Sequence, residues 1–115
     1  MTTEQVASMV DEFGVPSAYY QFRESTGQQP PFVCFFYSGD NDMKADDSNY
    51  AKIERLVIEV YTATKDLTLE STVESVLASY GFVWERDETY LGDESMFEII
   101  YQMDVVLTPE ENTEG

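Results

Sequence analysis

A group of carboxylates in one loop is the feature of this sequence that comes closest to a chemical site. The polar segment 38–49 carries Asp40, Asp42, Asp46 and Asp47. Carboxylate oxygens are the ligands that calcium prefers in proteins. The spacing departs from the EF-hand pattern, because Lys44 stands at an oxygen-ligand position and Ala45 stands where a glycine is needed. We therefore expect a solvated loop without a metal, with a loose divalent-cation site as the alternative.

The residues that usually carry enzymatic catalysis are missing or poorly placed. The sequence has no histidine, which excludes histidine general bases, histidine triads and histidine metal sites. Its one cysteine, Cys34, lies in an apolar run, so we expect an inert core thiol. Its 23 acidic residues could supply a carboxylate pair for glycoside hydrolysis, but nothing in the sequence selects two of them. No glycine-rich phosphate loop occurs. We expect neither an enzyme nor a cofactor.

The strong acidity of the chain limits its partners. Its 6 basic and 23 acidic residues give a net charge of −17 at pH 7. Such a field repels the phosphates of DNA and RNA, and it repels anionic membrane surfaces. Two explanations fit the charge: a solubilising shell, which we favour, or a surface that must not adhere to passing DNA. We expect no direct nucleic-acid binding and no membrane partner.

Cysteine content and hydropathy indicate where the chain is made. A single cysteine cannot form an intramolecular disulfide, and this suits synthesis in a reducing cytosol. The first residues, Met1 to Glu4, lack the basic and apolar regions of a signal peptide. No apolar run approaches the roughly 20 residues of a membrane span. The sequence therefore predicts a soluble protein that is intracellular when it is made.

Two segments have the apolar period of amphipathic helices. The first begins at a capping box formed by Thr2 and Gln5 and ends at Gly14. Its apolar stripe consists of Val6, Met9, Val10 and Phe13. The second helix is capped by Asp66 and terminated by Gly81. Its apolar face consists of Leu69, Val73, Val76, Leu77 and Tyr80. Both stripes predict helices that pack on a core.

Five other segments have the alternation or the apolar content of strands. They are residues 17–22, 32–37, 52–62, 82–90 and 96–107. Residues 23–29 read as a hairpin or short loop, and 38–49 read as a long loop of the kind that often carries function. Gly92 and Asp93 predict a tight turn between the last two strands.

Together these elements predict a single α+β domain over residues 1–107, followed by a disordered acidic tail over 108–115. The element order is αβββαββ, with an antiparallel-rich sheet of about five strands and two helices packed on the same sheet face. The opposite face would carry Glu59, Tyr61, Glu98 and Gln102, which suit water or a neighbouring subunit.

Four short motifs, taken in order and spacing, resemble a family of small tail-component proteins from tailed phages and prophages of Gram-positive bacteria. The motifs are Val15-Pro16 with Tyr19 to Phe22, Pro30 to Phe32 leading to Tyr37, Glu59 to Thr62 before Lys65-Asp66, and Met96 to Met103. The resemblance runs from about Val15 to Met103. Members look like siphophage tail terminator proteins, also called tail completion proteins.

The resemblance implies a structural virion protein that caps the tail tube and joins it to the head. Its partners would be further copies of itself, in a ring expected to be a hexamer, the major tail tube protein, and a head-completion or connector protein. DNA would pass through the ring without being bound. The chain would reside in the host bacterial cytoplasm during assembly and then in the tail or neck of the virion.

We expect the long loop and three tyrosines to form the assembly interface. The expected interface residues are Asp40, Asp42, Met43, Asp46, Asp47, Tyr50, Tyr61 and Tyr101. Tyrosine suits interfaces, although each of these three could instead occupy a core or rim position. Two alternatives stay open: a head-closure or connector protein of the neck, and an acidic DNA-mimic inhibitor. The second is less favoured, because the carboxylates are not regularly spaced along one extended segment.

Overall fold

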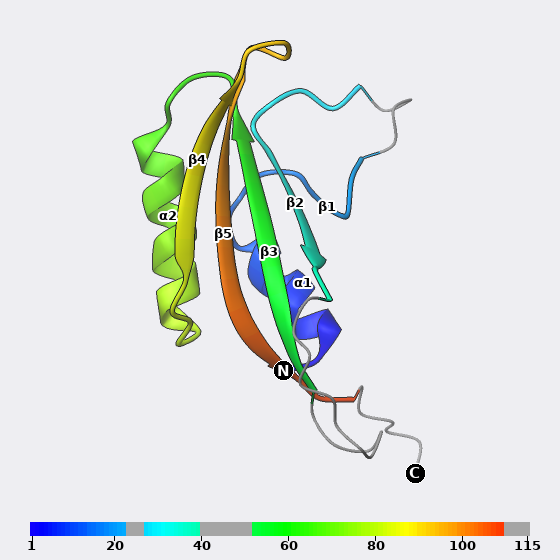
Figure 1. The fold of residues 1–115 in the computed structure, drawn as a ribbon. Helices are drawn as coiled ribbons and strands as arrows, with labels where there is room; N and C mark the ends of the chain where they lie inside the picture. Colours follow the sequence, from blue (N-terminus) through cyan, green and yellow to red (C-terminus); the bar gives the residue numbers. More distant parts are fainter. Residues whose placement is uncertain (23–26, 40–51, 110–115) are drawn as a thin grey trace.

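The computed structural model describes residues 1–22, 27–39 and 52–109. Within these ranges the chain forms two helices and one five-stranded sheet (Figure 1). The elements in chain order are α1 (Thr3–Asp11), β1 (Ser17–Tyr19), β2 (Phe32–Tyr37), β3 (Lys52–Thr62), α2 (Leu67–Ser79), β4 (Glu85–Leu91) and β5 (Met96–Leu107). The predicted α+β class and the order αβββαββ are confirmed.

The sheet has the spatial order β1-β2-β3-β5-β4. The ladder between β3 and β5 forms its centre and runs antiparallel from the pair Lys52 and Leu107 to the pair Thr62 and Phe97. The pairs β2–β3 and β4–β5 are also antiparallel. The bounds of β2, β3 and β5 agree with the predicted strands, because long alternation with one buried face specifies register strongly.

The first strand differs from the prediction in pairing and in length. A hairpin would make β1 and β2 antiparallel, but Ser17 to Tyr19 pairs with Val33 to Phe35 in parallel. The hairpin alternative for residues 23–29 is therefore wrong. The strand also ends at Tyr19 rather than at residue 22, because Tyr20 adopts a positive φ of 74° that interrupts the extended backbone.

The helix caps form as the sequence predicts. The Thr2 hydroxyl accepts a hydrogen bond from the Gln5 N–H at 3.1 Å, and the Gln5 side chain accepts one from the Thr2 N–H at 2.8 Å. The Asp66 carboxylate accepts from the Leu69 N–H at 2.9 Å and so caps α2. Side-chain caps of this kind each contribute about 1 kcal/mol.

Tyr80, which the sequence places on the apolar face of α2, instead follows the last residue of that helix and is exposed.

Gly81, which terminates α2, has a positive φ of 84° that glycine adopts without strain. The turn that Gly81 makes is followed by residues 82–84, which are not paired in the sheet. Strand β4 therefore begins at Glu85 rather than at residue 82, where the sequence pattern placed it.

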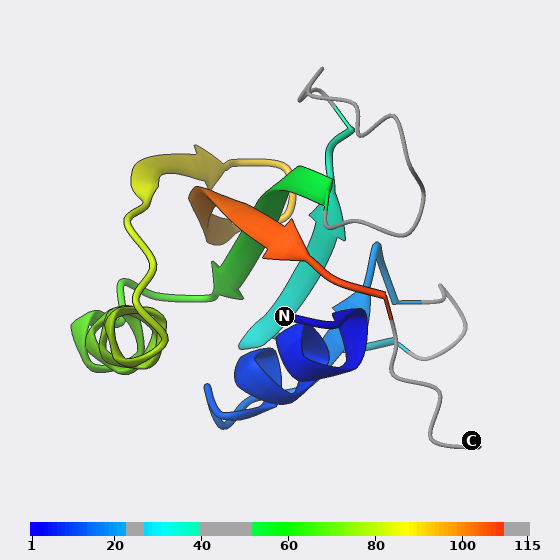
Figure 2. The same cartoon turned by 90° about the horizontal axis from the view of Figure 1, so that it is seen from below.

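Both helices cover the same face of the sheet, as predicted, and the structure has two layers (Figure 2). The core between the layers takes Val6, Met9 and Val10 from α1 and Leu69, Val73 and Leu77 from α2. It takes alternate residues from the sheet, including Val33, Phe35, Leu56, Ile58, Val60, Ile99, Tyr101 and Met103. Burying each aliphatic side chain contributes about 1.5–3 kcal/mol. No helix in the described ranges is long and apolar enough to cross a membrane.

The predicted disordered tail falls mostly on residues 110–115, which lie outside the described part of the chain. Its first residue, Thr108, donates its N–H to the Met1 carbonyl at 2.8 Å. The Met1 amino group in turn donates to the Val106 carbonyl at 2.9 Å. The described end of the domain is therefore tied to its N-terminus.

Candidate assembly surface

The helix-free face is the sheet face opposite both helices, and in the described residues no helix covers it (Figure 2). Strand pairing places Cys34, Glu59, Ile100 and Asp87 in one row across this face. The charged side chains on it are Arg55, Glu59, Glu85, Asp87, Glu98 and Asp104. Among the described residues, acids outnumber cations on this face and give it a negative charge. The prediction that it carries Glu59, Tyr61, Glu98 and Gln102 is confirmed by the register.

Tyr61 lies between two carboxylates on this face. Its hydroxyl oxygen is 2.8 Å from Glu98 Oε2 and 3.0 Å from Glu59 Oε1. A phenol has one proton, so it can donate to only one of these carboxylates at a time. Burial raises the pKa of Tyr61 far above its usual range, and the hydrogen bond to Glu98 raises it further. Tyr61 is therefore a neutral hydrogen-bond donor at any physiological pH.

Glu59 is half-buried beside Tyr61. Burial raises the pKa of its carboxyl, and the charge of Glu98 adds to the rise, while the hydrogen bond from Tyr61 opposes it. Two carboxylates that lie close together at a half-buried site disfavour the state in which both are ionised. The two strands β3 and β5 therefore carry a pair of carboxylates that repel each other on the helix-free face.

The chain after β1 packs over the β2 side of the helix-free face. Tyr20 stacks on Phe36 with ring centroids 5.3 Å apart, and Phe22 meets Phe32 edge-on at 5.5 Å. Cys34 lies beneath this segment and is only 5% exposed. Burial raises the pKa of its thiol, and the charge of Glu59 adds to the rise. A protonated, covered thiol is a poor nucleophile.

The only cation on the helix-free face in the described ranges is Arg55. Its guanidinium donates to Asp104 at 3.1 Å and to Glu85. These contacts link β3 to β5 and to the edge strand β4. Because both partners are more than half exposed, each pair contributes little to stability, at most about 1 kcal/mol.

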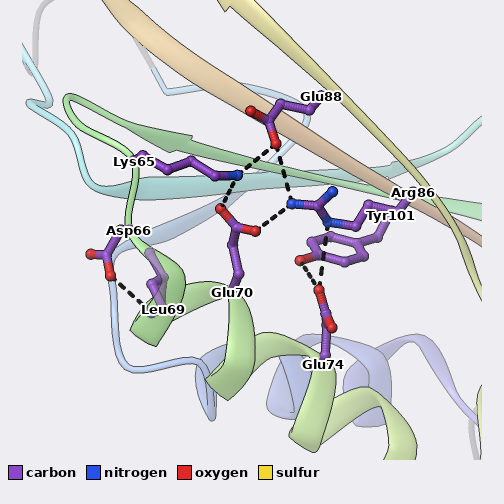
Figure 3. Close-up of polar contacts among 8 residues, drawn as sticks. All are labelled: Lys65, Asp66, Leu69, Glu70, Glu74, Arg86, Glu88 and Tyr101. Carbon is purple, nitrogen blue, oxygen red and sulfur yellow. Dashed lines mark hydrogen bonds and ion pairs between the residues drawn. The ribbon is translucent and has the colours of Figure 1, made fainter.

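A second polar group, which we call the α2–β4 network, lies on the helix side of the sheet (Figure 3). Its centre is Glu70, which faces inward from α2 and is 7% exposed. Glu70 accepts from Lys65 at 2.7 Å and from Arg86 on β4. Lys65 also donates to Glu88 at 2.6 Å. The network therefore connects the start of α2 to the edge strand.

The same network continues to the central strand β5. Glu74 of α2 forms an ion pair with Arg86 at 3.5 Å and accepts a hydrogen bond from the Tyr101 hydroxyl at 2.8 Å. Burial raises the pKa of Tyr101 well above its usual range, and its hydrogen bond to Glu74 raises it further. Sequence reasoning did not find this network. Its one visible signal is that Arg86 and Glu88 alternate onto the face that an amphipathic helix must cover.

The structure places only two of the expected interface residues. Asp40, Asp42, Met43, Asp46, Asp47 and Tyr50 lie outside the described residues. Tyr61 lies on the helix-free face, where its ring stacks on Phe32 at 4.8 Å. Tyr101 lies on the opposite face and is fully buried in the core. The structure therefore does not bring Tyr61 and Tyr101 together on one surface.

The two edges of the sheet differ in chemistry. Strand β4 forms one edge, and six of its seven residues are exposed. Short β1 forms the other edge, where Tyr19 and Tyr20 are exposed and meet edge-on at 5.4 Å. Exposed edge strands are places where another chain can add to a sheet. No group of three or more His, Cys, Asp or Glu side chains within the described part of the chain is arranged to hold a metal ion.

A scan against protein-family profiles matches no family, and a search of curated proteins finds no similar sequence.

Proposed function

We propose that this chain is a structural virion protein of a tailed phage or prophage, a tail terminator that caps the tail tube and joins it to the head. The observation that carries the proposal is the one-sided sheet. Both helices pack on one face, and in the described residues the acidic opposite face and the exposed strand β4 are left for contacts with other chains.

The charge of the chain supports the same role. A ring that surrounds a DNA channel works best when its surface does not bind DNA. A net charge of −17 repels phosphates, and the repulsion acts over about 8 Å at physiological ionic strength. The helix-free face contributes to that field, because its acids outnumber its one described cation.

Copies of the chain must still associate to form a ring. Heterologous contacts between two different surfaces of one chain generate closed rings when the rotation closes. The chain offers two different sheet edges, β1 and β4, at opposite ends of one sheet. Repulsion between like-charged copies favours assembly on a tube that supplies further contacts.

The experiment is complementation with purified protein. An extract of a phage that lacks this gene would contain filled heads and uncapped tails. We expect the added protein to bind the tail ends and to restore joining to heads and infectivity. Binding to isolated heads but not to tails would support the head-closure alternative and contradict the terminator. No binding to either would contradict both structural roles.

A further inference from the structure

A pocket of about 460 Å³ opens on the helix-free face, at its β2 side. Four of the nine described residues that line it are aromatic, namely Tyr20, Phe22, Phe32 and Tyr61, and two others are glutamines. Glu59 also lines it, and Glu98 lies one strand further on, bonded to the same Tyr61 hydroxyl. The pocket therefore combines aromatic rings with a half-buried carboxylate pair.

These two carboxylates differ from those of the α2–β4 network. Glu70 and Glu74 each face Arg86, and Glu70 also faces Lys65. By contrast, no cation of the described residues pairs with Glu59 or Glu98, and a single hydroxyl proton serves both. Buried or half-buried charges in proteins are normally paired. The helix-free face thus holds a carboxylate pair whose counter-charge is missing from the described chain.

The described cations of the chain are mostly engaged elsewhere. Arg55 bonds Glu85 and Asp104, while Lys65 and Arg86 belong to the α2–β4 network. A metal ion is not the natural occupant, because no group of three or more ligating side chains is assembled in the ranges that the structure describes. A cation that suits aromatic walls and carboxylates at once is a guanidinium or an ammonium.

We propose that this pocket receives an arginine or lysine side chain from a basic partner protein that docks on the helix-free face. Charge complementarity selects the partner: a second copy of this chain would bring its own charge of −17 to an acidic face, whereas a basic protein is attracted to it. The guanidinium of arginine fits best, because it stacks on aromatic rings and bonds two carboxylates at once. The pocket would take such a side chain whichever assembly the chain joins.

The test is an NMR titration of the isotope-labelled full chain with N-acetyl-arginine amide. N-acetyl-citrulline amide, which has nearly the same shape and no charge, is the matched probe. We expect the arginine probe to shift amide signals around Phe32, Cys34, Glu59 and Tyr61, with a dissociation constant on the order of 1 mM for this single contact. The citrulline probe should shift them at least about tenfold less at equal concentration.

Two double variants distinguish binding at the pocket carboxylates from nonspecific attraction of the cationic probe to an acidic protein. Glu59→Gln with Glu98→Gln removes the carboxylate pair and should abolish the response. Asp87→Asn with Glu94→Gln removes two charges from exposed residues of the β4–β5 hairpin and should leave it intact. Equal loss in both variants, equal response to both probes, or shifts spread evenly over all acidic residues would overturn the proposal. So would low-micromolar affinity for the free probe, which would mean a small-molecule site.

Discussion

At the scale of single residues, Glu59 and Tyr101 show how burial decides a role. Both lie in strands whose side chains point alternately to the two faces of the sheet, so a shift of one residue would move each to the opposite face. Glu59 lies on the helix-free face beside a second carboxylate, whereas Tyr101 lies in the core with its hydroxyl on Glu74. Glu59 is therefore a surface residue that is repelled by a neighbouring charge, whereas Tyr101 is a core residue that stabilises the fold.

Glu59→Gln should stabilise the protein at neutral pH. Glutamine keeps the oxygen that accepts from Tyr61 and removes the repulsion from Glu98. We expect a gain of about 0.5 kcal/mol at pH 7, measured by urea unfolding. Lower stability of the variant at pH 7 would contradict the account of the pair.

The pH dependence of that gain has a definite sign. Because the folded-state pKa of Glu59 is raised above its ordinary 4.5, its protonated form favours folding. That contribution is present below the ordinary pKa and is lost as the pH rises through the raised one. The gain from Glu59→Gln should therefore be absent near pH 4 and should grow toward neutrality. Glu94→Gln, which removes one charge from the exposed turn between β4 and β5, is the matched control.

Tyr101→Phe should lower stability without changing the surface. The variant keeps the buried ring and removes the hydroxyl that bonds Glu74 at 2.8 Å. We expect a loss of about 1.5 kcal/mol, since a hydrogen bond to a charged acceptor is removed. Tyr90→Phe, in which the altered ring is 55% exposed, should have little effect. If Tyr101→Phe left stability unchanged but prevented the chain from assembling into an oligomeric ring, Tyr101 would instead be an assembly residue.

At the scale of elements, the α2–β4 network fixes the edge strand to the helix layer. Most of β4 is exposed. The described contacts that hold it include the ladder with β5, the ring contact of Tyr90 with Phe97, and the ion pairs of Glu85, Arg86 and Glu88. Glu70 of α2, which pairs with Arg86, is the most buried carboxylate of the α2–β4 network. A strand held in this way keeps a defined edge available to a neighbour.

Glu70→Gln should destabilise the protein more than any other charge removal in the network. It would leave Lys65 and Arg86 without their shared buried partner. Breaking a buried pair costs 3–5 kcal/mol, and the partial exposure of both cations reduces this to about 2 kcal/mol. Denaturant unfolding measures the loss, and hydrogen exchange should show β4 amides less protected. Equal protection of β4 in wild type and variant would contradict the anchoring role.

Sequence patterns predict the elements that are decided locally. The capping box at Thr2, the Asp66 cap and the strands at 32–37, 52–62 and 96–107 follow from side-chain chemistry within a few residues. The parallel pairing of β1 does not, because it depends on where the chain crosses between strands. The α2–β4 network also cannot be predicted from sequence patterns, because Glu70 and Arg86 meet only when α2 packs on the sheet. Pocket residues from β2 and β3 converge for the same non-local reason.

At the scale of the whole molecule, charge governs association. Each chain carries −17, and like charges oppose the contact of free copies more strongly at low salt. We therefore expect a monomer or weak oligomer in isolation, with association that increases as salt screens the repulsion. Sedimentation velocity at about 50 mM and about 500 mM salt measures this. A tight hexamer that ignores salt would contradict it.

The central claim is that the chain terminates a phage tail, and electron microscopy of lysates from a phage lacking this gene tests it most directly. We predict tail tubes of excessive length beside unattached, DNA-filled heads, since nothing would stop tube growth or complete the joint. Tails of normal length beside heads that leak DNA would move the chain to the head side of the neck. Intact, infectious virions would contradict a structural role in the virion altogether.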